Sequence, residues 1–312
     1  MIMTGIKTIT ISPAFDLHYH LTRFEVGREN SVTDASKNVG GKGINTSRSL
    51  TANGVENTAY VFLGKENGEA FEDELKKEEL CYVPFYSEGR IRENITLHHG
   101  TETRISLNGF VPDEDMLEAL EARMLADGVK GAFVSFAGRI PKGLSAECVK
   151  AFLKRLKEAG ARLILDSQSL LPFDLCEIGP HLIKPNAQEI VEIYGKSADS
   201  LEGAAKAARD LAHGGLSHEV MVSLGERGAV WSDGDRCLAI RVPSLAMPVS
   251  TIGAGDSMIA GYLAGCAAQF DIEKTLALAA AYGTAACMRE GTLPPLARDI
   301  RGILQNTLVF GI

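Results

Sequence analysis

The segment GAFVSFAGRIPKGLSAECVKAFLKRLKEAGARLILDSQ, residues 131–168, decides the fold class. Its first part, GAFVSFAG, has the pattern of a buried strand. SAECVKAFLKRLKEAG follows as a helix that Gly160 ends, and RLILDSQ begins a second apolar strand. Continuous apolar strands that alternate with helices are typical of a parallel sheet with both faces covered. We therefore predict an α/β fold.

The same alternation extends to both sides of this segment. Residues 113–128, DEDMLEALEARMLADG, are predicted to form a helix with Met116, Leu117 and Leu120 on one face. HLIKPN (181–186) and VMVSLG (220–225) supply further short strands. The central sheet is thus expected to be mainly parallel.

Two regions interrupt this rhythm. Residues 13–36 are irregular and polar, and residues 81–110 alternate as strands, with NITLHH and TRISLNG joined through Gly100 and Thr101 as a hairpin. Together they predict a small discontinuous β lid beside the main sheet. Neither a Pro/Ser-rich linker nor a repeat divides the sequence. We therefore expect a single domain over residues 1–312.

Composition limits the function classes. The chain has 312 residues, 45% of them hydrophobic, and a net charge of −8, which argues against a nucleic-acid partner and against an anionic membrane surface. Its six cysteines form no metal-binding spacing, and several lie in apolar runs, as expected in a reducing compartment. The first residues lack the apolar core of a signal peptide. These features predict a cytoplasmic protein.

Two common nucleotide-binding loops do not match. A P-loop at NVGGKGIN would require glycine at Ser36 and a hydroxyl residue at Gly43. A dinucleotide fingerprint at GAGDSM would require glycine at Met258. The absence of a dinucleotide fingerprint disfavours a dehydrogenase.

The stretch STIGAGDS, residues 250–257, has two interpretations. If a helix begins here, the N–H groups of Ala254, Gly255 and Asp256 are free to bind an anion, and Asp256 is placed as a general base beside it. Alternatively, Asp256 is an ordinary N-cap that stabilises the helix by roughly 1 kcal/mol. This stretch alone does not separate the two.

Two further motifs are equally ambiguous. In KPNAQEI, Asn186 and Glu189 lie one helical turn apart, where an amide and a carboxylate suit Mg²⁺ or its waters, or simply cap the helix. SLGERG, residues 223–228, suits a backbone wrapped around a nucleotide, or a simple turn after a strand. In isolation the structural interpretation is favoured for both.

The order of four motifs is more specific than any of them. GGKGIN (40–45), KPNAQE, SLGERG and STIGAGDS resemble those of the ribokinase-like, or phosphofructokinase-B type, sugar kinases. The resemblance includes SPAFD (12–16) and AAYGTAACMREGT (280–292), and is greatest to 1-phosphofructokinases and tagatose-6-phosphate kinases. It implies a three-layer α/β/α fold with a mainly parallel central sheet and a small β-sheet lid.

The resemblance also implies an activity. This is ATP- and Mg²⁺-dependent phosphorylation of a ketohexose phosphate, with conversion of fructose 1-phosphate to fructose 1,6-bisphosphate as our first choice. The alternatives are tagatose 6-phosphate or fructose 6-phosphate as acceptor, and a non-catalytic regulator that binds a sugar phosphate. A homodimer that pairs through the exposed lid strands is also expected.

The family motifs assign roles at the nucleotide end. Asp256 corresponds to the catalytic base, and Asn186 with Glu189 to the Mg²⁺ motif, acting through water. The amides of three residues correspond to the anion hole: Gly253, Ala254 and Gly255. The positions around ATP are Lys184, Ser223, Gly225 and Gly228, with Ala281 to Thr284 bordering adenine.

At the acceptor end the resemblance places sugar contacts on Asp16, Gly40, Gly41, Lys42 and Asn45. Arg92 and Asn94 match a Thr-Arg-x-Asn pattern, although Ile91 replaces the threonine, and Arg92 is expected to bind the acceptor phosphate. On a strand Arg90 would face the same way as Arg92, and its role is left open. His98 and His99 are expected to be surface residues.

The chain departs from the family pattern around the sugar. Ser12 replaces the asparagine of the opening motif, Arg139 a small serine, and Arg104 a glutamate. Ser31 stands where an arginine is common, and Arg28 is placed as its substitute. Arg139 either binds a phosphate or fills part of the pocket, and the sequence leaves both open.

Overall fold

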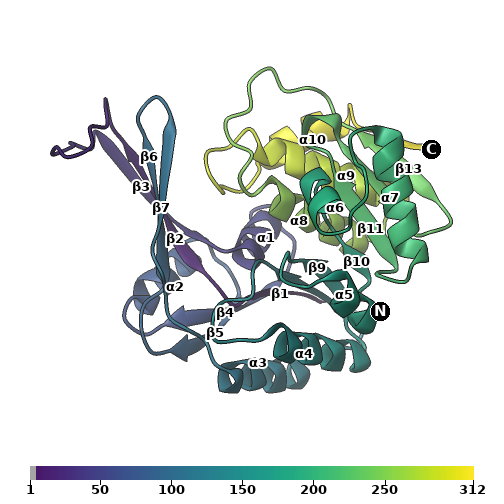
Figure 1. Ribbon diagram of the computed structural model, residues 1–312, viewed down its shortest axis with the longest axis horizontal. Helices are drawn as coiled ribbons and strands as arrows, with labels where there is room; N and C mark the ends of the chain where they lie inside the picture. Colours follow the sequence, from purple (N-terminus) through teal and green to yellow (C-terminus); the bar gives the residue numbers. More distant parts are fainter. Residues whose placement is uncertain (1–4) are drawn as a thin grey trace.

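A ten-stranded sheet forms the centre of the molecule, within residues 5–312, which the computed structural model describes (Figure 1). Its strand order is β14-β13-β12-β11-β10-β9-β8-β1-β4-β5, parallel from β11 to β5 and antiparallel from β11 to β14. The predicted mainly parallel sheet is confirmed. The strands are β1 (Ile6–Thr10), β4 (Thr58–Gly64), β5 (Tyr82–Ser87), β8 (Phe133–Ala137), β9 (Arg162–Asp166), β10 (Leu182–Ile183), β11 (Glu219–Ser223), β12 (Ala229–Ser232), β13 (Cys237–Arg241) and β14 (Leu308–Gly311).

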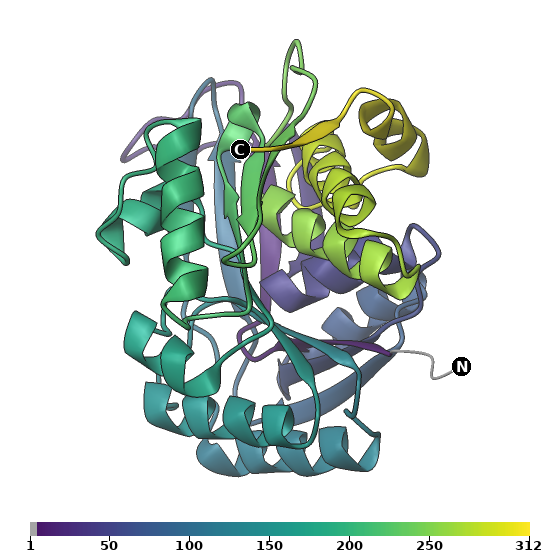
Figure 2. The same ribbon diagram turned by 90° about the vertical axis from the view of Figure 1, so that its right-hand side faces the viewer.

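Helices cover both faces of this sheet, and Figure 2 shows one group on each side. One face packs against α3 (Glu114–Ala126), α4 (Ala146–Glu158), α5 (Pro172–Ile178), α6 (Ala187–Glu192) and α7 (Leu201–His213). The other packs against α1 (Lys42–Thr51), α2 (Gly68–Lys77), α8 (Ala254–Ala267), α9 (Ile272–Ala286) and α10 (Ala297–Leu304). A short 3-10 turn, η1 (Gly225–Arg227), follows β11. This is the expected three-layer α/β/α fold.

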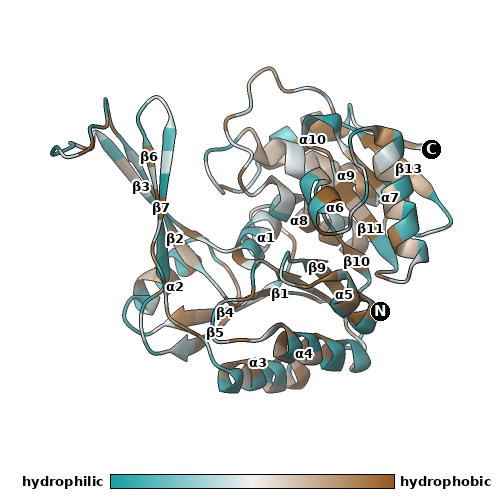
Figure 3. Ribbon diagram, in the orientation of Figure 1, coloured by the Kyte–Doolittle hydropathy of each residue, from teal (hydrophilic) through white to brown (hydrophobic). Residues whose placement is uncertain are grey.

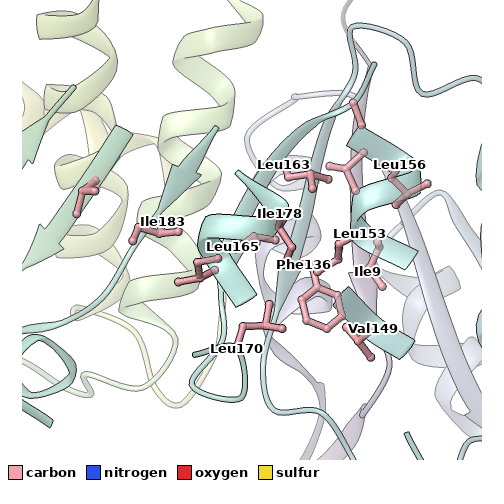
Figure 4. Close-up of a cluster of buried hydrophobic side chains, with 14 of the residues drawn as sticks. Ile9, Phe136, Val149, Leu153, Leu156, Leu163, Leu165, Leu170, Ile178 and Ile183 are labelled. Carbon is pink, nitrogen blue, oxygen red and sulfur yellow. The ribbon is translucent and has the colours of Figure 1, made fainter. Parts of the chain in front are cut away.

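Alternation along the strands explains the two apolar layers. On β9, Leu163 and Leu165 belong to the cluster under α3 to α7, whereas Ile164 belongs to the cluster under α8 and α9. Figure 4 shows the first cluster, where Phe136 and Leu153 meet between the sheet and α4. Figure 3 shows apolar strands and hydrophilic outer surfaces on α3 and α4. No helix in residues 5–312 has both the length and the apolar character needed to cross a membrane.

The predicted helices begin and end for local reasons. Ser145 caps α4 by accepting a hydrogen bond from the Cys148 N–H, and Gly160 has a φ of 95°, which lets the chain turn back after the helix. In α3, Met116, Leu117 and Leu120 are buried as predicted.

The lid is a separate four-stranded sheet of order β3-β2-β6-β7 that projects from the body (Figure 1). It consists of β2 (Ala14–His20), β3 (Asp34–Gly40), β6 (Arg92–His98) and β7 (Glu102–Ser106). The prediction for residues 13–36 was wrong in part, because β2 and β3 are regular strands and β3 extends to Gly40. Residues 82–87 are not part of the lid either, since β5 pairs with β4 at the edge of the main sheet. The β6–β7 hairpin is confirmed.

The order of the sheet indicates where a ligand binds. From β1 the chain moves to β4 and β5 on one side, and then from β8 to β11 on the other. The sheet therefore has its topological switch point between β1 and β8. In open α/β sheets ligands bind outside the carboxyl ends of the strands at this point.

Candidate active site

The start of α8 combines two features that suit an anion. Gly253 caps the helix in the left-handed conformation, with φ of 76°. The Ala254 N–H donates a long hydrogen bond of 3.4 Å to the Thr251 carbonyl, and the N–H groups of Gly255 and Asp256 follow it in the first turn, where an α-helix leaves its N–H groups without intrahelical partners. Lys184, which follows β10, brings its ammonium group to this point: a Cβ at Gly255 would lie 3.0 Å from Lys184 Nζ. A helix N-terminus beside a buried ammonium group favours a phosphate.

Asp256 lies in the first turn of α8 and is not the N-cap, so the capping interpretation is wrong. Its carboxylate is only 5% exposed, and Oδ2 accepts a hydrogen bond of 2.8 Å from Asn45 Nδ2. Burial raises the pKa of Asp256 to about 6; Lys42, Asn45 and Lys184 act in the opposite direction, and Asp166 adds to the rise. A carboxyl with this pKa is ionised at neutral pH and still accepts a proton readily.

A second buried carboxylate, Asp166 at the end of β9, was not singled out in the sequence. Its Oδ2 lies 3.2 Å from Lys42 Nζ and 3.4 Å from Lys184 Nζ. Burial alone would raise the pKa of Asp166, but the charges of Lys184 and Lys42 outweigh it and the pKa is lowered. Asp166 thereby holds the lysines of two motifs at one position. The available signal was an acid directly after a buried strand.

The glycines of GGKGIN have a packing role. A Cβ at Gly40 would lie 2.3 Å from Asp16 Oδ2, and one at Gly41, where φ is 125°, would lie 2.6 Å from Thr10 Cγ2. Gly43 similarly adjoins the carbonyl of Ile9. Gly41 and Gly43 let α1 begin directly against β1, which brings Lys42 to Asp166, and Gly40 leaves room for the Asp16 carboxylate on β2.

The polar face of the lid adjoins this region. Asn94 on β6 donates a 2.9 Å hydrogen bond to Asp16 Oδ1 on β2, and the strand register pairs the two residues. Arg92 makes one long contact, 3.4 Å from Nη2 to the Ser12 carbonyl, and its Nε is buried without a partner in residues 5–312. This side chain therefore offers an unsatisfied, positively charged donor.

Arg139 adds a second positive charge near Arg92. Burial lowers the pKa of Arg92, Asp16 raises it, and Arg139 lowers it further. Arg139 Nη2 donates to Gln168 Oε1 at 3.4 Å, and Gln168 Nε2 donates to Glu189 Oε1 at 2.8 Å. Gln168, which the sequence did not single out, thus links the acceptor side to the KPNAQE motif.

Asn186 and Glu189 form a helix capping box. Asn186 Oδ1 accepts from the Glu189 N–H and Glu189 Oε2 accepts from the Asn186 N–H, both at 2.9 Å. Across residues 5–312, no three His, Cys, Asp or Glu side chains are grouped so as to hold a metal. Because the oxygens of the pair already accept protein hydrogen bonds, the residues fit a hydrated Mg²⁺ held through water.

The predicted nucleotide positions are only partly accessible. Ser223 ends β11 opposite Asn186, and Gly225, with φ of 62°, begins the turn that follows. Packing alone explains the glycine at position 228, because a Cβ there would lie 1.9 Å from the Ile240 carbonyl oxygen. Ala281 is completely buried in the core, so its side chain is not available to adenine. Thr284, on the same helix, is half-buried.

Several predicted residues lie elsewhere. Arg28 is in the loop that joins β2 and β3 at the outer end of the lid, about 20 Å from Ala14 by strand length, so the structure does not bring it to Arg92. Arg90 pairs with Glu93, and Arg104 pairs with Glu102 on the edge strand. His98 is not a plain surface residue, because its Nε2 lies 3.0 Å from Nδ1 of the buried His18. His99 is half-buried and bonds to Thr103.

Comparisons with known proteins identify the family of the chain. The sequence profile described as pfkB family carbohydrate kinase matches residues 12–298. The chain is 33% identical over 286 residues to 1-phosphofructokinase of Bacillus subtilis, covering 91% of this chain and 93% of the relative. It is 29% identical to tagatose-6-phosphate kinase of Staphylococcus epidermidis, covering 92% and 93%.

Solved structures show the same relationship. Phosphofructokinase-2 from Escherichia coli in complex with fructose-6-phosphate superposes with a TM-score of 0.88 at 26% identity, covering 97% of this chain and 99% of that one. The chain belongs to the PfkB family of carbohydrate kinases. It is therefore a phosphotransferase, and membership implies ATP as the phosphate donor.

Replacing Asp256 with Asn is expected to stabilise the fold at alkaline pH. The pKa of about 6 in the folded chain exceeds the ordinary value of 3.8, so the unfolded chain releases the proton first as the pH rises. Above about pH 6 the wild-type protein carries the full cost of a buried carboxylate, about 3 kcal/mol, which the variant lacks.

Urea unfolding near pH 4.5 and near pH 8 measures this effect. The gain in free energy of unfolding from Asp256→Asn should be about 2 kcal/mol larger at the higher pH. The same gain at both pH values would contradict a raised pKa for this carboxyl.

Proposed function

We propose that this kinase transfers the γ-phosphoryl group of ATP to a ketohexose phosphate, with fructose 1-phosphate as the acceptor and fructose 1,6-bisphosphate as the product. The observation that carries the proposal is the position of the buried Asp256. Gly255 and Lys184, the proposed anion site, lie on one side of Asp256. Lys42 lies on the other side, next to the lid face that carries Asp16 and Arg92. A base between two phosphate-binding regions suits an acceptor that already carries a phosphate.

The reaction follows from these positions. The acceptor hydroxyl gives its proton to Asp256, its oxygen attacks the γ-phosphorus of ATP, and the bond to the bridging oxygen of the departing ADP breaks. The amides of Gly253, Ala254 and Gly255 stabilise the charge on the transferring group, and Lys184 adds a positive charge beside them. Asn186 and Glu189 would hold Mg²⁺ through water, and the ion would supply positive charge to the nucleotide phosphates.

The lid supplies acceptor recognition. Arg92 offers a buried donor without a partner, and Arg139 places a second guanidinium nearby. Guanidinium groups bind phosphate oxygens in a fixed fork. The choice of fructose 1-phosphate is supported by relatives named 1-phosphofructokinase at 31–33% identity, and tagatose 6-phosphate is the alternative that the 29% relatives support.

An acceptor panel tests this proposal. Purified protein with ATP and Mg²⁺ is supplied separately with fructose 1-phosphate, fructose 6-phosphate, tagatose 6-phosphate, fructose and ribose, and ADP release is measured. We expect the highest kcat/KM with fructose 1-phosphate. Preference for an unphosphorylated sugar would contradict the roles of the arginines, and bound ATP without turnover on any acceptor would favour a regulator.

Arg92→Gln is expected to lower kcat/KM for the phosphorylated acceptor by about 10- to 100-fold, since a hydrogen bond to a charged group is lost. Turnover of unphosphorylated fructose, however slow, should change little. Arg104→Gln is the matched control, because Arg104 is exposed on the same lid and pairs with Glu102. Equal losses in the two variants, or with both kinds of sugar, would show that Arg92 does not bind the phosphate.

We also infer that the lid pairs with a second copy of the chain. Its two faces differ: Asp16, His18 and Asn94 lie on one, whereas the cross-strand pair Leu17 and Ile95 lies on the other. Ile105, opposite Ile95 on β7, belongs to the apolar face and is 47% exposed. A half-exposed apolar sheet face is suited to burial against an identical face.

Ile105→Glu should convert a particle of about twice 33.4 kDa into a monomer of 33.4 kDa in sedimentation equilibrium. Arg104→Glu introduces the same charge on the opposite face of β7 and should leave the dimer intact. A wild-type protein that is monomeric at every concentration would overturn this inference without affecting the proposed chemistry.

A further inference from the structure

The helix that follows the GGKG glycines contacts the catalytic helix through a row of polar side chains. Asn45 Nδ2 donates to Asp256 Oδ2 at 2.8 Å, and Thr46 Oγ1 donates to the Asp256 carbonyl at 3.2 Å. One turn further along, the hydroxyls of Ser49 and Ser257 lie 3.0 Å apart. Asn45 is the member of this row whose side chain bonds the carboxylate itself.

The side-chain amide of Asn45 is only partly hydrogen-bonded, whereas an amide with a purely structural role would use both its oxygen and its nitrogen. It is 7% exposed, and its Oδ1 is buried without a hydrogen-bond partner in residues 5–312. An unpaired buried acceptor costs free energy of folding. The fold nevertheless keeps this side chain with its amide nitrogen directed at the base.

We propose that Asn45 is a positioning residue for the general base: its amide fixes Oδ2 of Asp256 and leaves Oδ1 as the oxygen that takes the proton of the acceptor hydroxyl. This role goes beyond the sugar contact expected for the motif, and it rests on the assignment of Asp256 as the base. The rotation of the carboxylate about its Cβ–Cγ bond is then set by α1, the helix that also carries Lys42.

The same hydrogen bond adjusts the acidity of the base. Burial raises the pKa of Asp256, and the Asn45 amide opposes this because it donates to the ionised form. The other charged groups that act on Asp256 are Lys42 on α1, Asp166 at the end of β9 and Lys184 after β10. Loss of the amide should therefore raise the pKa and also let the carboxylate turn away from the acceptor.

Asn45→Leu removes the amide and keeps the number and branching of the side-chain heavy atoms. Ser49→Ala is the matched control, since it removes a neighbouring α1–α8 hydrogen bond that does not touch the carboxylate. The pH dependence of kcat at saturating acceptor is measured for both. In Asn45→Leu the acidic limb should move upward by about one pH unit, and kcat should fall at least tenfold at neutral pH. In Ser49→Ala the limb should stay in place.

A second measurement does not depend on turnover. In protein with ¹³C-labelled aspartate carboxyls, the signal of Asp256 is identified by its loss in Asp256→Asn and is titrated in each variant. An upward shift in Asn45→Leu and none in Ser49→Ala supports the proposal. An unchanged titration, with only KM raised, would overturn it and leave the kinase assignment intact. Failure of the assignment itself would differ, because the wild-type protein would then turn over no acceptor.

Discussion

The site depends on one constraint, the burial of the Asp256 carboxylate at the start of α8. A carboxylate removed from water is destabilised unless charges and donors compensate it, and here the compensation is incomplete, so the pKa rises to about 6. Lys42 and Lys184 balance Asp256 and Asp166 in number. These four groups are thus balanced in charge before any phosphate binds, and Asp166 holds both ammonium groups beside the starts of α1 and α8.

Topology explains why these side chains meet. The chain reverses its direction across the sheet between β1 and β8, which leaves a crevice at the carboxyl ends of the strands. Asp166 ends β9 at this edge, Lys184 follows β10, and α1 begins after the glycine turn at Gly41. The lid then brings residues from β2 and β6 over the same place, so that Asp16 and Asn94 meet although 78 residues separate them. A lid with a polar inner face can enclose the acceptor and exclude water.

Much of this could be predicted from the sequence. The apolar strands and the helix face with Leu120 follow from hydrophobic periodicity, because each element buries one face or both. The hairpin follows from the turn residues at Gly100 between two strand patterns. The sheet to which β5 belongs could not be predicted, because a strand at residues 82–87 could pair with the lid or with β4 until tertiary packing decides. Asp166 was missed because its two lysine partners are 124 and 18 residues away in the chain. The KPNAQE motif was ambiguous because the same residue types suit a hydrated ion and a helix capping box, and Asn186 and Glu189 do form the capping box.

The central claim is that Asp256 is the base of a phosphoryl transfer. The most direct measurement is kcat of Asp256→Asn on the acceptor that the wild-type protein prefers, together with the dissociation constant of ATP by calorimetry. The account predicts that kcat falls by about 10²- to 10⁴-fold or more while ATP binds with nearly unchanged affinity, because the amide keeps the shape of the carboxyl but cannot accept the proton. A kcat close to that of the wild-type protein would contradict it.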